Sequence, residues 1–371
     1  MKIYGLDSRI FMSLRATITV HFMRLRLINS VKKSNSEKRS KPHMSIFNAT
    51  SHTIEQAAQC LRGGGLVAFP TETVYGLGAD ARNSEALTRI FIAKNRPQDH
   101  PLIVHLASFE QFDAWACDIS ESAVQLAQHF FPAPLAIILK KRPDINTVVT
   151  GGQDTVALRV PNHPVALDLL RAFGDGIAAP SANRFCRISP TQATHVQQEL
   201  GDSVDMILDG GACQIGVEST IIDLSGDHPM LLRYGQIMRS ELEKVLNLNV
   251  LIPDALRKST VRTAGMMAAH YAPNTPAMLC ENTAIPHFIE TNTQMKIGIL
   301  SCGDTFSSYA HCAVISLPAN PIIYAQNLYA KLRELDALKL DVILVQTPPQ
   351  TEDWQAINDR LAKATHNFRE H

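Results

Sequence analysis

Hydroxyl side chains recur at every second position in the segment PTETVYGLGADA, where Thr71, Thr73 and Tyr75 follow the apolar run LVAF. Side chains two residues apart share one face of a strand. The spacing therefore predicts three hydroxyls on one face of a strand end, where they could bind a polar ligand. Thr and Tyr also favour strands for reasons of packing alone. The glycines Gly76 and Gly78 would let the chain turn beside a ligand without a Cβ in the way.

Two cations come next, at the end of a predicted helix in KNRPQDHPLIVH. Lys94 offers a point charge and Arg96 a planar fork, which together could clamp phosphate groups. The same pair would also stabilise the negative end of the helix dipole. Pro97 and Pro101 restrict the following backbone to extended conformations, which would hold both cations in place.

A third cation, Arg159, lies within the alternating segment TVALRVP, on the same predicted strand face as Thr155 and Ala157. An arginine in the middle of a partly buried strand requires an anion, because an unpaired buried charge is costly. That anion is either an internal carboxylate or a substrate, and the pattern leaves both open.

The remaining polar candidates stand at predicted ends of elements: His105, Ser181, Asn183, Ser189, Ser219, Thr220 and Arg233. Taken singly, most of these are explained by turn chemistry. Together they surround four cations with hydroxyls and amides, and no general acid–base pair or nucleophile–base dyad accompanies them. This combination is typical of a site that binds a polyphosphate and a carboxylate and works by positioning and charge neutralisation.

Hydrophobic periodicity predicts an α+β first domain and a smaller C-terminal α/β unit of Rossmann-like character. Helices are expected over 51–65, 84–95, 164–174 and 191–201, and strands over 66–74, 101–107, 135–141, 155–161, 176–183, 204–211, 219–225 and 230–235. From 295 the order is strand, strand, helix, strand, helix. The expected domains are a basic extension over 1–43 that is disordered or precedes the true start, a catalytic domain over 51–240, a linker over 241–276 and a C-terminal domain over 277–371.

Composition describes an ordinary globular chain of 371 residues, 45% hydrophobic, with equal numbers of acidic and basic side chains. Ten of the 35 Lys and Arg residues lie in 1–43, so the rest of the chain is mildly acidic. That balance argues against a protein whose main task is to grip a nucleic acid backbone. Seven scattered cysteines without a C-x-x-C pair, and no apolar run long enough to span a membrane, favour a cytoplasmic protein with reduced thiols.

Six motifs, in this order and at these spacings, resemble the YrdC-type threonylcarbamoyl-AMP synthase domain: PTETVYGLGADA, K-x-R-P followed by PLIVH, TVALRVP, APSAN…SPT, GVEST and LRYG. The C-terminal unit, reached through a linker that contains HYAP, resembles the two-domain version of that family, so the likeness covers about 52–371. It implies a twisted open α/β sheet with a large concave cavity lined by positive charge. It also implies that L-threonine, bicarbonate and ATP, with Mg2+, yield threonylcarbamoyl-adenylate and pyrophosphate. A separate transferase would then use the product to modify the adenosine next to the anticodon of tRNA, with at most weak direct tRNA binding here.

The resemblance assigns a role to each motif residue. Threonine would be held by Thr73, His105, Arg159, Ala179 and Ser219. ATP would be held by Lys94, Arg96, His100, Thr155, Ser181, Asn183, Ser189, Arg233 and Tyr271, with Lys94 and Arg96 as the catalytic cations and no side-chain ligand for a metal. Tyr271, in the linker, would close over the nucleotide.

Three positions depart from the family pattern. His100 replaces a common Asn, Cys186 replaces a usual Gly in the loop after APSAN, and the segment before HYAP lacks the Pro and basic residues often found there. A related hydrogenase-maturation enzyme carries the same domain, but such a chain would be much longer and would contain Cys-rich zinc fingers. The alternative function is a non-catalytic RNA-binding module associated with translation.

Overall fold

The computed structural model describes residues 46–253, 261–263, 265–267, 269–304, 306, 309 and 311–366. The predicted extension over 1–43 lies outside the described residues. Residues 44–371 cluster as one unit. No helix in the described ranges is both long enough and apolar enough to cross a membrane.

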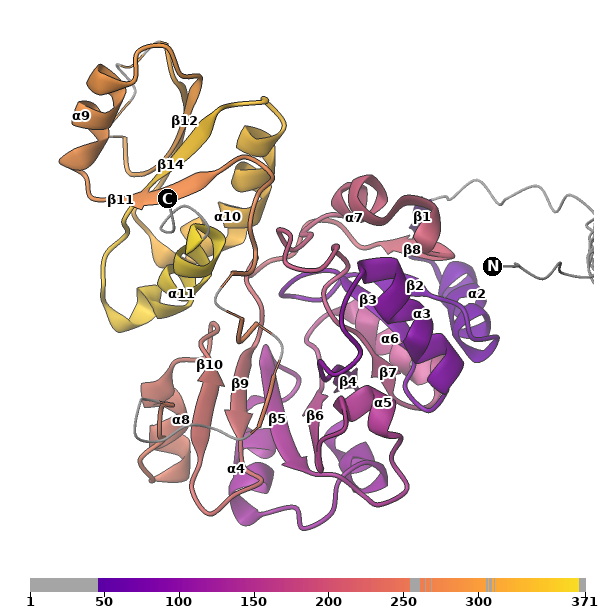
Figure 1. The fold of residues 1–371 in the computed structure, drawn as a ribbon. Coiled ribbons are helices and arrows are strands. Elements are labelled where there is room, and N and C mark those ends of the chain that lie inside the picture. Colours follow the sequence, from indigo (N-terminus) through magenta and orange to yellow (C-terminus); the bar gives the residue numbers. More distant parts are fainter. Residues whose placement is uncertain are drawn as a thin grey trace, which may run out of the picture. The chain divides into compact units, whose positions relative to one another are not determined.

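A mixed ten-stranded sheet forms the larger part of the chain, in the order β1-β8-β2-β3-β7-β4-β6-β5-β9-β10. Its strands are β1 (Ile46–Asn48), β2 (Val67–Phe69), β3 (Gly76–Asp80), β4 (Ile103–His105), β5 (Leu135–Lys140), β6 (Thr155–Arg159), β7 (Ile177–Ala178), β8 (Met206–Asp209), β9 (Thr220–Asp223) and β10 (Met230–Arg233). Some neighbouring strands are parallel, such as β4 and β6, and others are antiparallel, such as β6 and β5. The fold class expected from the sequence is confirmed (Figure 1).

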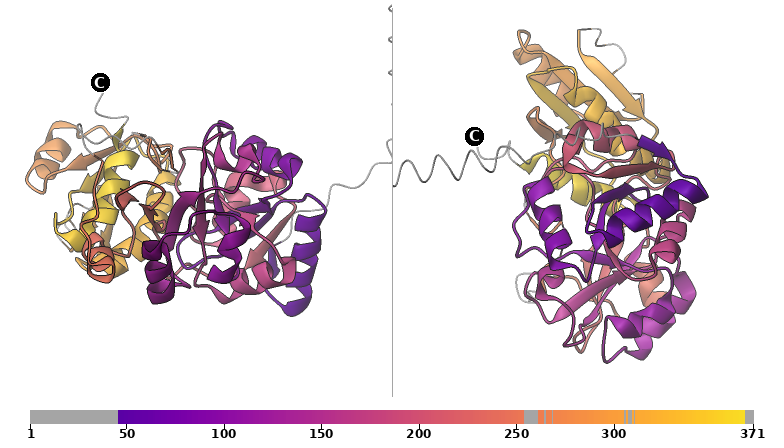
Figure 2. Two further views of the ribbon diagram at one scale, coloured as in Figure 1. Left: turned by 90° about the horizontal axis from the view of Figure 1, so that it is seen from below. Right: turned by 90° about the vertical axis from the view of Figure 1, so that its right-hand side faces the viewer.

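Helices pack on both faces of this sheet (Figures 1 and 2). They are α2 (Ser51–Arg62), α3 (Ser84–Lys94), α4 (Glu121–Phe130), α5 (Thr147–Thr150), α6 (Pro164–Phe173), α7 (Ala193–Leu200) and α8 (Arg239–Leu246), with 3-10 turns at Phe109–Ala114 and Gly201–Ser203. Helices α2 and α6 share one core cluster with the sheet, while α3, α4, α7 and α8 contribute to a second, larger cluster.

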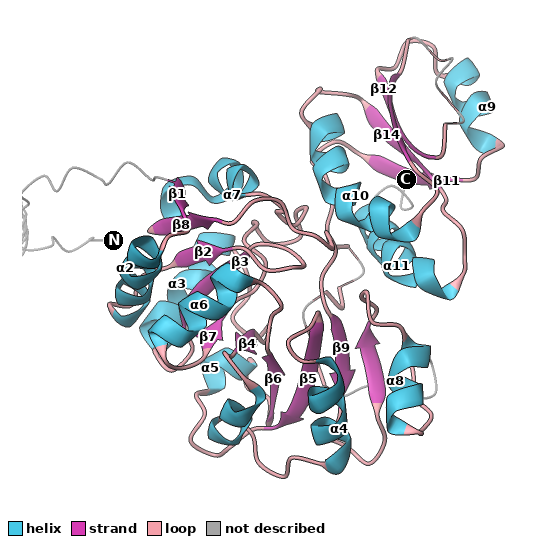
Figure 3. Cartoon of the chain, turned by 180° about the vertical axis from the view of Figure 1, so that it is seen from behind, coloured by secondary structure: helices cyan, strands magenta, loops and turns pink. Residues whose placement is uncertain are grey.

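One face of the sheet is only partly covered by helices. His105 pairs in register with Ile177, so Ile103 and His105 lie on the face that α2 and α6 cover further along. At β4, β5, β6 and β9 that face carries a small apolar cluster to which no helix in the described part of the chain contributes. Figure 3 shows β6, β5 and β9 side by side there. This open stretch of sheet is where the site is built.

Helix α3 positions the two cations of K-x-R-P. The Asn83 side chain accepts hydrogen bonds from the backbone N–H groups of Glu85 and Ala86 and so begins the helix. Asn95 ends it with a left-handed backbone (φ 52°), and Pro97 follows, which cannot continue a helix. Lys94 therefore leaves the last helical turn in a fixed direction.

The C-terminal unit is a parallel four-stranded sheet in the order β11-β14-β12-β13, with strands β11 (Ala277–Cys280), β12 (Ile297–Cys302), β13 (Ala313–Leu317) and β14 (Val342–Gln346). Helices α10 (Pro321–Asp336) and α11 (Gln355–Ala364) pack on one face and α9 (Ala284–Thr291) on the other. A short 3-10 turn, Glu352–Trp354, precedes α11.

The largest difference from the sequence prediction lies at the segment PTETVYG. The strand expected over 66–74 ends at Phe69, and 70–75 forms the loop of a β2–β3 hairpin. Thr71 explains why: its Oγ1 donates to the Val74 carbonyl at 2.6 Å and accepts from the Thr73 and Val74 N–H groups. A threonine that satisfies its neighbours' backbone in this way favours a turn over a strand. Tyr75 points away from the two threonines and donates to the Gly211 carbonyl at 2.8 Å.

The two glycines of this segment serve packing within β3 instead of a turn beside a ligand. A Cβ on Gly78 would lie 2.8 Å from Phe69 Cε1 and 2.9 Å from Ile177 Cγ2. A Cβ on Gly76 would lie 3.2 Å from the Cβ of Ala179. Neither glycine lies in a turn, so that part of the prediction is wrong. Close approach to neighbouring side chains constrains both, and Gly76 also lines the cavity of the candidate site.

We expect Gly78→Ala to lower the free energy of unfolding by about 1–3 kcal/mol, because its Cβ would overlap Phe69 and Ile177 in a filled core. Urea unfolding measures the change. Gly226→Ala is the matched control: this glycine is exposed, and a Cβ there meets nothing within 4 Å. Equal stability of the two variants would contradict the packing role of Gly78.

Candidate functional site

A small cavity of about 50 Å3 lies at the ends of β4 and β6, next to the uncovered stretch of sheet. The hairpin loop after β2, the ends of β4, β6 and β10, the loop after β7 and the linker surround it. The polar residues that line it are Thr71, Thr73, Arg96, His105, Arg159, Ser181, Glu218, Arg233, His270 and Tyr271. Ala179 lines it too, with its N–H bonded to the Ile103 carbonyl at 3.0 Å.

Arg159 reaches the cavity from the end of β6 and is held by the hairpin loop. Its Nη2 forms an ion pair with Glu72 Oε1 at 2.7 Å and donates to Thr73 Oγ1 at 3.0 Å. Both charged side chains are 5% exposed. The internal carboxylate left open by the sequence is therefore present, and it is Glu72. Arg159 Nε is buried and has no acceptor among the described residues.

His105 lies on β4, directly opposite its register partner Arg159 on β6. Its Nδ1 lies 3.3 Å from the Ile103 carbonyl. Burial, and secondly the Arg159 guanidinium, lower the pKa of His105 to about 3. The imidazole is thus neutral at physiological pH and can hydrogen-bond a ligand without adding charge.

Lys94 and Arg96 are both buried but do different things. Lys94 Nζ donates to the carbonyls of Ser181 and Asn183, and so fixes the loop after β7 from behind the cavity wall. Arg96 lines the cavity, donates to the Pro101 carbonyl at 2.9 Å and keeps a buried Nε without an acceptor. Burial lowers the pKa of both, that of Arg96 to about 10. Within the described residues, neither forms an ion pair with a carboxylate.

The fourth cation, Arg233, ends β10 and is tied to the start of β9. Its Nε donates to the Ser219 carbonyl at 2.9 Å, and its Nη2 donates to Ser219 Oγ at 3.0 Å. Burial lowers the pKa of Arg233, although the neighbouring Tyr271 opposes this shift. The structure therefore brings Arg96, Arg159 and Arg233 to one cavity, with Lys94 directly behind it.

The linker closes the remaining side of the cavity. Tyr271 is buried, with a left-handed backbone (φ 61°). Its ring stacks on that of Tyr329 at 5.8 Å. His270 lines the cavity next to it, and burial lowers the pKa of His270 to about 3. The backbone of Cys186 is also left-handed (φ 63°), as a position that usually holds Gly would require, and its carbonyl accepts from the Ala272 N–H at 2.9 Å.

Several residues predicted to bind ATP, and Ser219, predicted to bind threonine, do not line this cavity. Thr155 begins β6 at the strand's far end and lines a neighbouring hollow with Gln153 and Thr263. His100 packs edge-on against Phe185, at 5.2 Å between ring centroids. Asn183 donates to the carbonyls of Arg184 and Arg187 and, like Ser189 and Ser219, supports the wall from behind.

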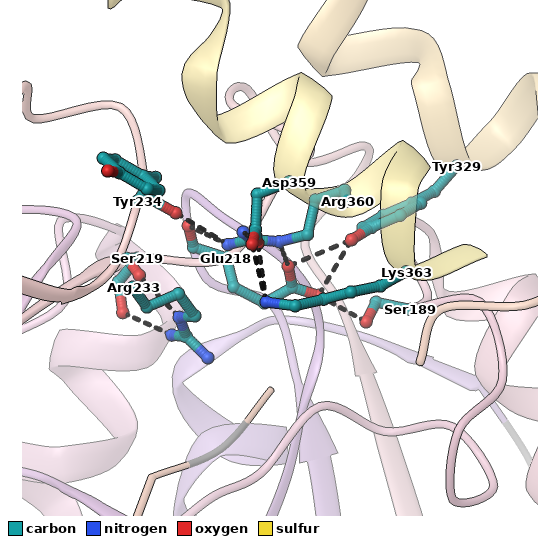
Figure 4. A network of polar contacts seen from close by, with 9 residues as sticks. All are labelled: Ser189, Glu218, Ser219, Arg233, Tyr234, Tyr329, Asp359, Arg360 and Lys363. Carbon is teal, nitrogen blue, oxygen red and sulfur yellow. Dashed lines mark hydrogen bonds and ion pairs between the residues drawn. The ribbon is translucent and has the colours of Figure 1, made fainter. Parts of the chain in front are cut away.

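Sequence reasoning missed Glu72, Glu218, Tyr329 and Arg360. Glu218 Oε1 accepts from Ser189 Oγ at 2.5 Å, and its Oε2 pairs with Arg360 Nε at 2.7 Å (Figure 4). Burial alone would raise the pKa of Glu218, but the charges of Arg360 and Arg233 and the Ser189 hydroxyl together lower it to about 2. The available signal was a glutamate directly before the buried strand β9, since a buried carboxylate requires a cation.

No group of three or more His, Cys, Asp or Glu side chains placed to hold a metal ion occurs in the described ranges. The two carboxylates at the site, Glu72 and Glu218, are each paired with an arginine.

Comparison with known proteins gives matches over both domains. A family model described as Telomere recombination matches residues 59–235, and one described as Threonylcarbamoyl-AMP synthase, C-terminal domain, matches residues 237–365. Threonylcarbamoyl-AMP synthase of Pyrococcus abyssi is 42% identical over 324 residues, which cover 84% of this chain and 94% of the relative. The protein of the same name from Bacillus subtilis is 40% identical over 320 residues, covering 84% and 92%. The crystal structure of P. abyssi Sua5 complexed with L-threonine matches with a TM-score of 0.81 at 40% identity, over 87% of this chain and 98% of that one.

The buried histidines predict how stability depends on pH. The pKa of His270 is about 3 in the folded protein, below the ordinary value of 6.5, so protonation favours the unfolded chain. The contribution of neutral His270 to the free energy of unfolding is fully present above pH 6.5 and is lost as the pH falls toward 3. We expect His270→Gln to flatten this loss by about 1.4 kcal/mol per pH unit between pH 6 and 4.

Urea unfolding at several pH values tests this expectation. His129→Gln is the control, because this histidine lies on the exposed surface of α4. A His270→Gln slope that matches the wild-type slope would show that the folded protein accommodates a charged His270.

Proposed function

We propose that this chain, which belongs to the threonylcarbamoyl-AMP synthase family, makes threonylcarbamoyl-AMP and pyrophosphate from L-threonine, bicarbonate and ATP. The observation that carries the proposal is the excess of buried positive charge around one cavity. Arg96 and Arg159 each keep a buried Nε without an acceptor there. Because an unsatisfied buried donor is costly, such groups favour a ligand that brings acceptors with it.

Threonine fits the wall formed by Thr73, His105 and Arg159. The Arg159 guanidinium, oriented by Glu72, can donate to the substrate carboxylate through its remaining N–H groups. Neutral His105 and the Thr73 hydroxyl supply hydrogen bonds without a competing charge. The structure of the P. abyssi relative with L-threonine supports a threonine pocket in this fold.

ATP is assigned to the side of Arg96, Arg233 and the loop after β7, which Lys94 holds in place. Since Glu72 and Glu218 are already neutralised by arginines, we propose that Mg2+ enters as the complex with ATP and is held by the phosphates. The ion would neutralise charge on the phosphates and the leaving group.

The chemistry then needs positioning and charge neutralisation. The threonine amine combines with bicarbonate to give a carbamate and water. A carbamate oxygen attacks the α-phosphorus, and the bond to pyrophosphate breaks on the opposite side. Arg96 and Arg233 face the charge that develops on the phosphates, in a site from which the linker excludes water.

The linker must open for this reaction. A cavity of about 50 Å3 holds one or two water molecules and is far too small for a nucleotide. Gly265, His270 and Tyr271 form the closing wall. We therefore propose that this segment moves aside to admit ATP and then closes over it, as the sequence predicts for Tyr271.

We further propose a cytoplasmic enzyme whose product passes to a separate tRNA-modifying transferase. All seven cysteines are free, as expected in a reducing compartment.

The direct test is pyrophosphate release. We expect release to depend on L-threonine, bicarbonate and ATP together, and Arg96→Met to reduce the rate on the order of 10²–10³-fold, as loss of one preorganised donor does. Arg89→Met is the control, because Arg89 lies on α3, the helix that leads to Arg96, but pairs with Asp205 at the surface. Pyrophosphate release that is independent of threonine, or equally reduced by both substitutions, would overturn the proposal.

The rival RNA-binding module makes a different prediction. A mildly acidic body predicts weak tRNA binding by this protein. Filter binding of tRNA over a salt series, without ATP, measures it; tight binding that weakens steeply with salt would favour the rival.

A further inference from the structure

The ion pair between Glu218 and Arg360 links the two domains of the protein at the edge of the site. Arg360 belongs to α11 of the C-terminal unit and has no solvent exposure. Its Nε lies 2.7 Å from Glu218 Oε2, and its Nη2 donates to the Tyr234 carbonyl at 2.9 Å. Nη1 pairs with Asp359 at 2.6 Å, within its own helix. One guanidinium thus binds two segments of the first domain at once (Figure 4).

Those two segments are the ones that carry Ser219 and Arg233. Glu218 precedes Ser219 just before β9, and Tyr234 follows Arg233 just after β10. On the site side, Arg233 donates to the carbonyl and the hydroxyl of Ser219. On the other side, Arg360 ties together the residues next to this pair. The β9–β10 pair forms one edge of the ten-stranded sheet. Arg233 is the last residue of its ladder, paired with Ile221, whereas Glu218, Ser219 and Tyr234 lie beyond the ladder and are not fixed by it.

Arg360 also contacts the linker, through the ring of Tyr271. The Arg360 guanidinium carbon lies 5.2 Å from the centroid of the Tyr271 ring, which stacks on Tyr329. Tyr329 Oη also donates to Glu218 Oε2 at 3.0 Å. Arg360 therefore contacts, directly or through Glu218, three parts of the cavity wall that come from different places in the chain.

We propose that the C-terminal domain supplies Arg360 as a positioning residue, which acts through Glu218 and Tyr234 to set the geometry of the Ser219–Arg233 pair for threonine and ATP. Arg360 does not line the cavity and is not a catalytic residue. The inference rests on the proposed function, which places Arg233 on the ATP side of the site, where Ser219 holds it. It gives the C-terminal domain a task in the reaction beyond folding.

Three variants test this. Arg360→Met keeps much of the buried apolar volume but removes the charge and every donor. Arg360→Lys keeps a charge that can pair with Glu218 but loses the fork that also reaches the Tyr234 carbonyl. The matched control is Arg333→Met. Arg333 also crosses from the C-terminal unit, where α10 carries it, pairs with Glu199 of α7 at 3.1 Å and donates to the Ile188 carbonyl. Within the described part of the chain, its hydrogen bonds and ion pairs include neither Glu218 nor Tyr234.

Steady-state pyrophosphate release gives kcat and KM for threonine and for ATP. We expect Arg360→Met to raise both KM values and to lower kcat/KM on the order of 10²-fold, the effect of a displacement of about 1 Å at a site. Arg360→Lys should lie between this variant and wild type, and Arg333→Met should stay within a few fold of wild type.

A merely structural role predicts a different pattern. Loss of folded enzyme lowers kcat in proportion and leaves both KM values unchanged, and that result would overturn the proposal. So would equal KM changes in Arg360→Met and Arg333→Met, which would indicate general loosening of the domains. If Arg360→Met does not fold, Arg360→Lys decides alone, with unchanged KM values against the proposal. Wild-type protein without threonine-dependent release would instead contradict the proposed function itself.

Discussion

Burying several cations around one small cavity is the constraint on which the rest of this structure depends. Like charges at close range raise each other's energy, and burial removes the water that would screen them. The chain meets this cost in two ways. Lys94 and Arg96 donate to backbone carbonyls. These acceptors satisfy hydrogen-bond donors of the two side chains but do not neutralise their positive charge. Arg159 and Arg360 are instead paired with the buried carboxylates Glu72 and Glu218. The uncompensated remainder is the charge available to an anionic ligand.

The two buried ion pairs are a weak source of stability and a strong source of geometry. The cost of desolvating both partners offsets most of their attraction, whereas removal of one partner leaves a buried charge and costs about 3–5 kcal/mol. Each pair is therefore difficult to break once formed. Glu72 fixes Arg159 against Thr73, and Glu218 fixes Arg360 against the start of β9. In both cases the carboxylate holds an arginine in one orientation, and the site gains precision more than the fold gains free energy.

Sequence patterns predicted the elements well where hydrophobic period and caps agree, as in α3 and α6. The patterns failed where a side chain, instead of a neighbouring strand, hydrogen-bonds the backbone groups that a sheet would use. Thr71 bonds its own neighbours' backbone, so the alternation of hydroxyls that suggested a strand belongs to a hairpin loop. In a strand, Glu72 would have pointed away from Thr73. In the loop, both reach the same guanidinium, which alternation alone cannot predict.

The site shows the same division between local and long-range information. The motifs named the cations, because charged residues at the ends of elements are visible in one short segment. They did not show that Thr155 and His100 lie away from the cavity, since that depends on which end of a strand faces the linker. They also could not reveal Arg360, which stands 142 positions after the glutamate it neutralises. A helix of the second domain completes the charge balance of the first. The two domains are therefore one electrostatic unit at the place where the linker must open and close.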